Sequence, residues 1–164
     1  MAPGGAIGDG VDSVSGGDGM AVRNADAVWK GDLKTGQGTV KVGSGAFEGS
    51  YSFPSRFENG RGTNPEELIG AAHAACFSMA LAAGLSAAGH VPTSVHTTAK
   101  VHLDRGGEGF AITRIELEVE GEVPGIDEGT FRQQADNAKK NCPVSKALAG
   151  TQVALTARLI GPSR

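Results

Sequence analysis

Two cysteines are the residues of this sequence with the clearest capacity for chemistry. Cys76 and Cys142 are the only cysteines in 164 residues, and residues 77–141 separate them. This spacing is not the Cys-x-x-Cys motif of thioredoxin-like proteins. It leaves open whether the two sulfurs meet, which requires Cα atoms within about 7 Å. A meeting pair favours thiol–disulfide chemistry. The structural alternative is a small buried apolar residue at Cys76 and a turn residue at Cys142.

The local settings of the two thiols differ. Cys76 lies in the middle of a long predicted helix, far from the positive end of its dipole. Cys142 directly precedes Pro143, which suits the first position of a short helix, so Cys142 is expected near an N-cap, where the dipole stabilises a thiolate. By this argument alone Cys142 is the more acidic thiol. Cys76 would need a cation brought from elsewhere, and Arg56 is the natural candidate.

Glu66 and His73 belong to the same predicted helix as Cys76. Glu66 suits the first helical turn, where an acid stabilises the dipole, but it is about 15 Å from Cys76 along the helix axis. Any action of Glu66 on Cys76 is therefore expected from the partner chain of a dimer. His73, one turn before Cys76, fits a base, a metal ligand or a core histidine, and the last is favoured. Metal-binding motifs such as His-Glu-x-x-His are missing from the sequence, so a metal site has little support.

The stretch from Asn64 to Gly89 predicts the central element of the fold, a helix about 35 Å long. Asn64 is its expected N-cap, Pro65 its first residue and Gly89 its stop signal. Apolar side chains occupy nearly its whole circumference, which predicts a helix that is buried on every side or spans a membrane. The acidic start, His73 and Ser78 interrupt the apolar run and argue against a membrane span.

The remaining elements predict an α+β fold with a mainly antiparallel sheet around this helix. Alternating apolar residues and turn signals predict strands at 22–29, 38–42, 95–103, 111–119 and 153–159, a second helix from Asp127 to Lys140 and a short helical run at 143–148. Residues 50–63 are interpreted as a polar segment that carries Arg56 into the central helix.

Domain organisation and assembly follow from the same pattern. Residues 1–20 are glycine-rich and are predicted to form a disordered tail, whereas residues 21–164 form a single domain. The few short strands of one chain are too little to cover so apolar a helix. We therefore expect an obligate homodimer with two central helices buried between two sheets.

Composition argues against several classes of function. The net charge is −3 and aromatic residues make up 5% of the chain, so neither a basic surface nor a stacking platform for nucleic acid is expected. No signal peptide is recognised at the N-terminus. Together with two cysteines, this favours a cytoplasmic protein whose thiols stay reduced, with no membrane partner.

Two longer runs resemble a known family. Residues 64–81, NPEELIGAAHAACFSMAL, resemble the first cysteine motif of the osmotically inducible protein C (OsmC) family, and residues 141–148, NCPVSKAL, resemble its second. Shorter matches at residues 29–32, 55–58 and 110–113 follow in the family's order. The wording of residues 73–79 is similar to the OsmC branch rather than to the related organic hydroperoxide resistance (Ohr) proteins. The resemblance implies an OsmC-like fold, with sheets wrapped around long central helices in an intertwined homodimer.

The resemblance also implies a function, a thiol-dependent peroxidase in oxidative and osmotic stress defence. Such proteins reduce organic hydroperoxides, and hydrogen peroxide less well. Cys76 matches the peroxidatic cysteine and Cys142 the resolving cysteine, so the implied cycle runs through a Cys76 sulfenic acid and a Cys76–Cys142 disulfide.

The resemblance assigns two further residues. Arg56 matches the arginine that holds the thiolate and the peroxide, and Glu66 matches the acid that orients this arginine. A nearby guanidinium can stabilise the Cys76 thiolate more than a helix N-terminus stabilises that of Cys142. The resemblance therefore implies that Cys76 is the more acidic thiol, the reverse of the order expected from the helix dipole. No cofactor or metal is implied, and an external dithiol, of the lipoyl type, is the implied reductant.

Two alternatives from other classes remain at this point. One is a non-enzymatic homodimer that binds an apolar ligand or a metal through His73 and the cysteines. The other is a purely structural stress protein. In both, the two thiols survive treatment with peroxide.

Overall fold

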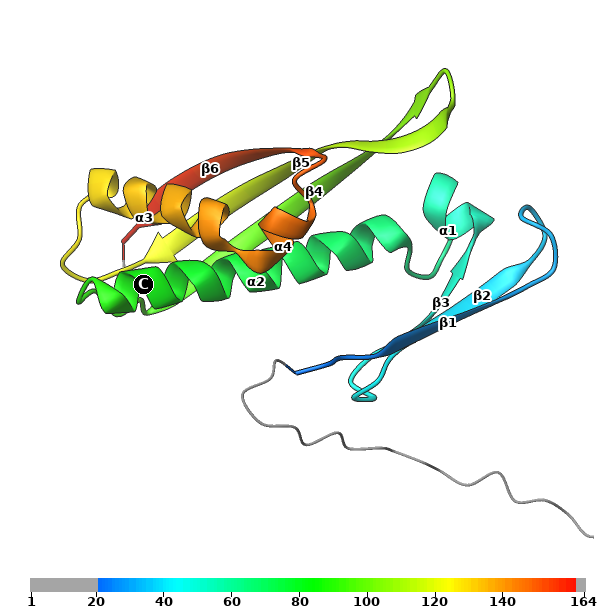
Figure 1. Cartoon of the computed structure of the whole chain (residues 1–164), viewed down its shortest axis with the longest axis horizontal. Helices are drawn as coiled ribbons and strands as arrows, with labels where there is room; N and C mark the ends of the chain where they lie inside the picture. The colour runs from blue at the N-terminus through cyan, green and yellow to red at the C-terminus, as the bar shows by residue number, and fades with distance from the viewer. Residues whose placement is uncertain (1–20, 162–164) are drawn as a thin grey trace, which may run out of the picture.

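A computed structural model of the chain describes residues 21–161, so the predicted tail at 1–20 lies outside the described residues. Within that range the chain forms two three-stranded sheets and four helices (Figure 1). In chain order the elements are β1 (Ala25–Lys30), β2 (Gln37–Val42), β3 (Glu48–Ser52), α1 (Phe53–Phe57), α2 (Pro65–Ala87), β4 (Ser94–Gly106), β5 (Gly109–Glu122), α3 (Glu128–Asn141), α4 (Pro143–Ala147) and β6 (Gln152–Ile160).

The C-terminal sheet carries the core of the described chain. β4 and β5 form a long antiparallel hairpin, as predicted, and β6 pairs with β5 in parallel because α3 and α4 cross over between them. α2 and α3 pack on one face of this sheet (Figure 1). The core side chains are Phe77, Leu81 and Leu85 of α2, Ile115, Leu117 and Val119 of β5, and Phe131, Ala135 and Ala138 of α3.

A glycine lets α3 approach this sheet closely. The ring of Phe131 lies over Gly121 of β5, where a Cβ atom would come within 2.4 Å of the ring. Any larger residue at this position would push α3 away from the strand. This close contact helps to fix α3, and with it α4, against α2.

The N-terminal sheet lies apart from this core (Figure 1). Trp29, Gly38 and Tyr51 are in register on β1, β2 and β3, and the rings of Trp29 and Tyr51 meet over Gly38 with centroids 5.3 Å apart. The apolar side chains of Val28 and Leu33 stay exposed. A three-stranded sheet needs an apolar layer against one face to be stable, and its own chain provides little of that layer.

The central helix α2 begins and ends as predicted. The Asn64 side chain accepts a hydrogen bond from the Glu67 backbone N–H at 2.8 Å, and Gly89 follows the last turn with a φ of 85°. The single chain does not bury α2 on every side, and the burial expected within a homodimer stays a prediction. Only one stripe is buried, because β4 and α3 cover the helix from one side; it consists of Glu66, Gly70, His73, Phe77, Leu81 and Leu85.

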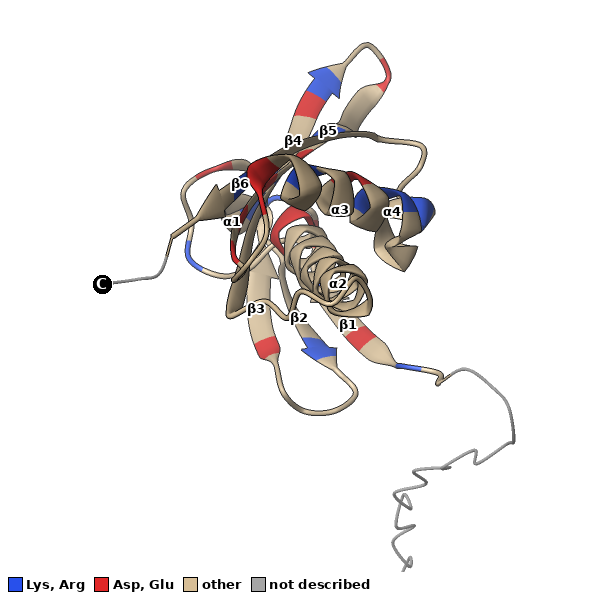
Figure 2. Ribbon diagram, turned by 90° about the vertical axis from the view of Figure 1, so that its left-hand side faces the viewer, with Lys and Arg blue, Asp and Glu red and all other residues tan. Residues whose placement is uncertain are grey.

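The opposite face of α2 is apolar and uncovered. Ala72, Ala75, Met79 and Ala83 form an exposed row at helical spacing, here called the α2 stripe, and Met79 is 75% exposed. Figure 2 shows that α2 carries charged residues only at its acidic start. By length and composition alone α2 is long and apolar enough to cross a membrane, yet its buried face packs inside a folded domain.

A second correction concerns residues 50–63, which were predicted to be a polar segment. They contain the end of β3 and the short helix α1. Ser52 and Ser55 form a reciprocal capping box, and Pro54 lies in the first turn. Five residues are too few to show a helical period, so only the capping residues signal this helix.

Candidate active site

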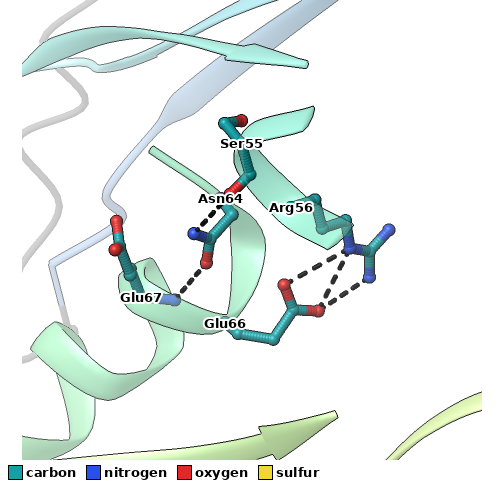
Figure 3. A network of polar contacts seen from close by, with 5 residues as sticks. All are labelled: Ser55, Arg56, Asn64, Glu66 and Glu67. Atoms are coloured by element: carbon teal, nitrogen blue, oxygen red, sulfur yellow. Dashed lines mark hydrogen bonds and ion pairs between the residues drawn. The ribbon is translucent and has the colours of Figure 1, made fainter. Parts of the chain in front are cut away.

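Arg56 and Glu66 form an ion pair inside one chain (Figure 3). The Arg56 Nη2 group donates to Glu66 Oε1 at 2.8 Å, and Nε donates to Oε1 and Oε2 at 3.2 and 3.3 Å. Glu66 is buried, with 7% of its surface exposed, whereas about a third of the Arg56 side chain is exposed. The other amino group of Arg56 points away from Glu66 in Figure 3 and is free to meet a second anion.

The loop between α1 and α2 holds this ion pair in place. The Ser55 hydroxyl donates to the Thr63 carbonyl oxygen at 2.7 Å. The Asn64 side-chain amide donates to the Ser55 carbonyl oxygen at 3.1 Å, as Figure 3 shows. Asn64 also caps α2 through Glu67. The N-cap residue of α2 therefore also fixes α1, which brings Arg56 to Glu66.

A pocket of about 530 Å³ opens beside the ion pair. Arg56 and Glu66 lie at one end of it, and small or apolar side chains of α2 and β4 line most of the rest. These include Gly70, Ala71, Ala74, Ala99, Val101 and Leu103. A cation next to an apolar wall suits a ligand with one polar end and an organic tail.

Cys76 and Cys142 meet on the other flank of α2. Cys76 is half-buried in the middle of the helix, and Cys142 is fully buried at the start of α4. The two thiols are within hydrogen-bonding reach of each other, and both are reduced. The sequence left open whether these sulfurs meet, and the packing of α4 against α2 brings them together.

Cys142 occupies the N-cap position of α4, as predicted. Pro143 is in the first turn, and the Cys142 Sγ accepts a hydrogen bond from the Ser145 backbone N–H at 3.5 Å. Burial disfavours the thiolate of Cys142, but hydrogen bonds from the Ser145 N–H and from Cys76 outweigh it and set the pKa of Cys142 below its ordinary value. The N-cap therefore favours ionisation of this thiol.

Cys76 shows the opposite behaviour. Burial raises the pKa of Cys76 above its ordinary value, the backbone N–H of Val144 partly offsets this, and the neighbouring Cys142 adds to the rise. Within residues 21–161 of one chain no cation contributes to the ionisation of Cys76. The order of acidity in the single chain is thus the one that the helix-dipole argument predicts.

His73 is a core histidine, as the sequence favoured, but only half of its hydrogen-bonding capacity is used. It is fully buried, and its Nε2 atom lies 2.7 Å from the Ser145 hydroxyl. Its Nδ1 atom is buried without a hydrogen-bond partner in the described chain. Burial lowers the pKa of His73, so its ring is neutral at pH 7. Sequence reasoning missed this role of Ser145.

The described residues also contain no cluster of three or more histidine, cysteine or acidic side chains that could bind a metal ion. Of the four predicted site residues, the chain brings Cys76 to Cys142 and Arg56 to Glu66. It does not bring the two pairs together, since the thiols face α4 and the pocket at the ion pair faces β4. Glu66 and Cys76 are about 15 Å apart along α2.

The chain is similar in sequence to proteins of one known family. The sequence model of the family described as OsmC-like protein matches residues 58–157. The chain is 55% identical over 127 residues to peroxiredoxin OsmC of Escherichia coli (strain K12), a match that covers 77% of this chain and 89% of the relative. It is also 36% identical over 92 residues to an organic hydroperoxide resistance protein of Xanthomonas axonopodis pv. citri (strain 306), covering 56% of this chain and 63% of that one.

Solved structures show the same fold. The crystal structure of the organic hydroperoxide resistance protein OhrB of Bacillus subtilis matches with a TM-score of 0.64 and 25% identity, over 84% of this chain and 98% of that one. The family model covers more than half of the chain, and the Escherichia coli relative is similar over most of its length. The chain therefore belongs to the OsmC-like protein family, on its OsmC branch.

Proposed function

We propose that this protein is a thiol-dependent peroxidase that reduces organic hydroperoxides, and hydrogen peroxide less well, in stress defence. The observation that carries the proposal is the meeting of Cys76 and Cys142 across α2 and α4, together with an ion pair between Arg56 of α1 and Glu66 at the start of α2. The printed names of the relatives, peroxiredoxin and organic hydroperoxide resistance protein, support the same class of activity.

The proposed first step is the attack of the Cys76 thiolate on the peroxide. Its sulfur bonds to one oxygen, the O–O bond breaks, and the alcohol leaves after taking up a proton, which gives a Cys76 sulfenic acid. Arg56 polarises the peroxide and stabilises the thiolate, and Glu66 holds the guanidinium in place. The pocket beside Arg56 accepts the organic tail.

The proposed second step regenerates the site through Cys142. Its thiolate attacks the sulfenic sulfur, a disulfide forms, and hydroxide leaves and is protonated to water. An external dithiol of the lipoyl type then reduces the disulfide by exchange and becomes a disulfide itself. This cycle uses no bound cofactor.

We further propose that the working enzyme is a homodimer in which the two halves of the site come from different chains. The α2 stripe and the exposed apolar side chains of the N-terminal sheet need cover, and a second copy of the chain offers apolar surface of the same kind. A guanidinium from the partner also supplies the cation that Cys76 lacks in its own chain. In this arrangement Arg56 of the partner subunit acts on Cys76.

The experiment that tests the peroxidase proposal is a thiol count before and after one equivalent of cumene hydroperoxide per chain. The reduced protein should lose both thiols to an intrachain disulfide, and Cys76→Ser should keep its remaining thiol. Cys142→Ser should react once and then stop at a sulfenic acid that over-oxidises. If the unmodified protein keeps both thiols, the cysteines are structural or ligand-binding and the proposal is wrong.

A further inference from the structure

A buried chain of polar contacts leads from the core of the protein to Cys142. His73 of α2 and Ser145 of α4 are far apart in the sequence, yet His73 Nε2 lies 2.7 Å from Ser145 Oγ, and both residues are buried. The Ser145 backbone N–H donates to Cys142 Sγ, and its hydroxyl also lies within hydrogen-bonding reach of that sulfur. Ser145 is therefore the link between the imidazole and the thiol.

The direction of these hydrogen bonds follows from the number of protons. A serine hydroxyl has one proton to donate. When Ser145 donates that proton to the Cys142 sulfur, its oxygen must accept from His73, so Nε2 carries the ring proton of His73. Nδ1 is then an acceptor without a hydrogen-bond partner in the described chain. In this state, two donors of Ser145 point at the same sulfur.

A buried imidazole with one nitrogen that lacks a hydrogen-bond partner lowers the stability of the folded protein. A leucine of similar size would fill the same core position without leaving a polar atom unsatisfied. Within the described chain, the one side-chain hydrogen bond of His73 goes to Ser145, whose backbone N–H donates to the Cys142 sulfur. The contact between His73 and Ser145 is therefore better explained by an effect on the Cys142 thiol than by the stability of the core.

We propose that His73 and Ser145 are positioning residues for Cys142, with His73 orienting the Ser145 hydroxyl so that Ser145 directs both its donors at the Cys142 sulfur. The inference rests on the proposed peroxidase cycle, in which Cys142 attacks the sulfenic acid of Cys76. In that step the new S–S bond forms as the S–O bond breaks, and the departing hydroxide takes up a proton. The two donors keep Cys142 ionised and aimed at Cys76 until the attack.

The surroundings of Cys142 contain no competing charge in the described chain. The titratable groups that face it are Cys76 on α2 and, through Ser145, the neutral His73. Its ionisation depends on hydrogen-bond donors, namely the backbone N–H groups of Val144 and Ser145, the Ser145 hydroxyl and the Cys76 thiol. Removing one donor should therefore have a measurable effect on the pKa of Cys142.

The first test needs no peroxide. In a Cys76→Ser parent only Cys142 carries a thiol, and its ionisation is followed by the ultraviolet absorbance of the thiolate as pH rises. Ser145→Ala should raise the measured pKa of Cys142 relative to the parent. Ser78→Ala is the matched control, because it deletes a hydroxyl of α2 that contacts Thr97 at 2.7 Å instead of a cysteine. An unchanged titration in Ser145→Ala overturns the proposal.

The second test separates the two chemical steps in a single turnover with cumene hydroperoxide. Ser145→Ala should form the Cys76 sulfenic acid at the normal rate and then close the disulfide about tenfold more slowly. His73→Leu should slow the same step, and His73→Gln, which restores a donor, should recover part of the rate. Disulfide closure at the normal rate in both Ser145→Ala and His73→Leu overturns the proposal.

Failure of this inference is distinguishable from failure of the proposed function. If the unmodified chain forms no sulfenic acid, the peroxidase proposal is wrong, but the thiolate titration still decides whether Ser145 sets the pKa of Cys142. Thermal unfolding of each variant checks that it is folded. Should His73→Leu not fold, Ser145→Ala alone decides the outcome, because it removes only one oxygen atom.

Discussion

The thiol pair and the ion pair are held by the protein in different ways. Cys76 and Cys142 meet because α4 packs on α2, and residues far apart in the sequence bury them. Arg56 and Glu66 meet through a short loop, and Arg56 keeps about a third of its side chain exposed. The thiol pair is packed between two helices of its own chain. The ion pair leaves one amino group of Arg56 pointing away from Glu66 (Figure 3), beside an open pocket.

This difference is the basis of the proposal that the two pairs act together in a dimer. No cation contributes to the ionisation of either thiol in the described chain. Burial raises the pKa of Cys76, so the thiol form, a poor nucleophile, is favoured at neutral pH. The exposed guanidinium has no thiol in its pocket. The thiol pair has no cation and the ion pair has no thiol. We propose that a second chain, bound over the α2 stripe, brings the two pairs together.

Among the variants considered, Arg56→Ala is expected to have the largest effect on the oxidation of Cys76, because it removes the cation of the ion pair. Oxidation of Cys76 should slow about a hundredfold at pH 7. The pKa of Cys76 should rise, so the reaction should recover as pH increases and more of the thiol ionises. The measurement is the rate of sulfenic acid formation against pH in a Cys142→Ser parent.

Arg61→Ala is the matched control for this change. Arg61 is an exposed arginine of the loop between α1 and α2, and its loss should leave the rate and the pH profile unchanged. Equal rates for Arg56→Ala and the unmodified protein at neutral pH would remove Arg56 from the site.

Met79→Glu tests whether the α2 stripe is the surface through which two chains form the proposed dimer. A charge in the middle of the α2 stripe would have to be buried unpaired in a dimer, so the variant should be mainly monomeric at micromolar concentration and lose most of its peroxidase activity. Sedimentation velocity measures the first effect and a coupled dithiol assay the second. Val91→Glu places the same charge on a similarly exposed apolar residue outside the stripe and should remain dimeric. A fully active monomer would refute the shared site.

A smaller effect is expected from Glu66→Gln, which keeps the shape of the acid but removes its charge. The guanidinium loses a charge-assisted partner yet stays near its position, so peroxide reduction should slow about tenfold. Steady-state kinetics with cumene hydroperoxide measure the change. Glu67→Gln alters the neighbouring acid of the same helical turn and should have little effect. Similar losses in both variants would point to the helix dipole instead of Arg56.

Local signals in the sequence predict much of this fold. The capping residues Asn64 and Asp127, the alternation in β4 and β5, and the N-cap position of Cys142 all depend on neighbours within a few residues, and the structure confirms them. The helix α1 was not predicted, because five residues are too few to show a helical hydrophobic period. The capping serines and Pro54 at its start were the signals that could have revealed it.

The contacts within the candidate site are harder to predict from local sequence signals. The family resemblance pointed to all four residues, but spacing alone could not show that Cys76 meets Cys142, since that contact depends on how α4 packs. The link from His73 to Ser145 crosses the same interface and has no sequence signature. The pattern did predict that Glu66 is too far along α2 to reach Cys76 of its own chain, and the separate pocket at the ion pair is consistent with this.

The most direct test of the shared site is complementation between two inactive variants. Cys76→Ser chains keep Arg56, and Arg56→Ala chains keep both thiols, so a mixed dimer contains one complete site only if the arginine acts across the interface. The two chains are co-expressed with different tags, and the mixed dimer is purified through both. We predict peroxidase activity near half that of the unmodified dimer. A mixed dimer as inactive as its two parents would show that Arg56 does not serve the partner's Cys76, and would contradict the account.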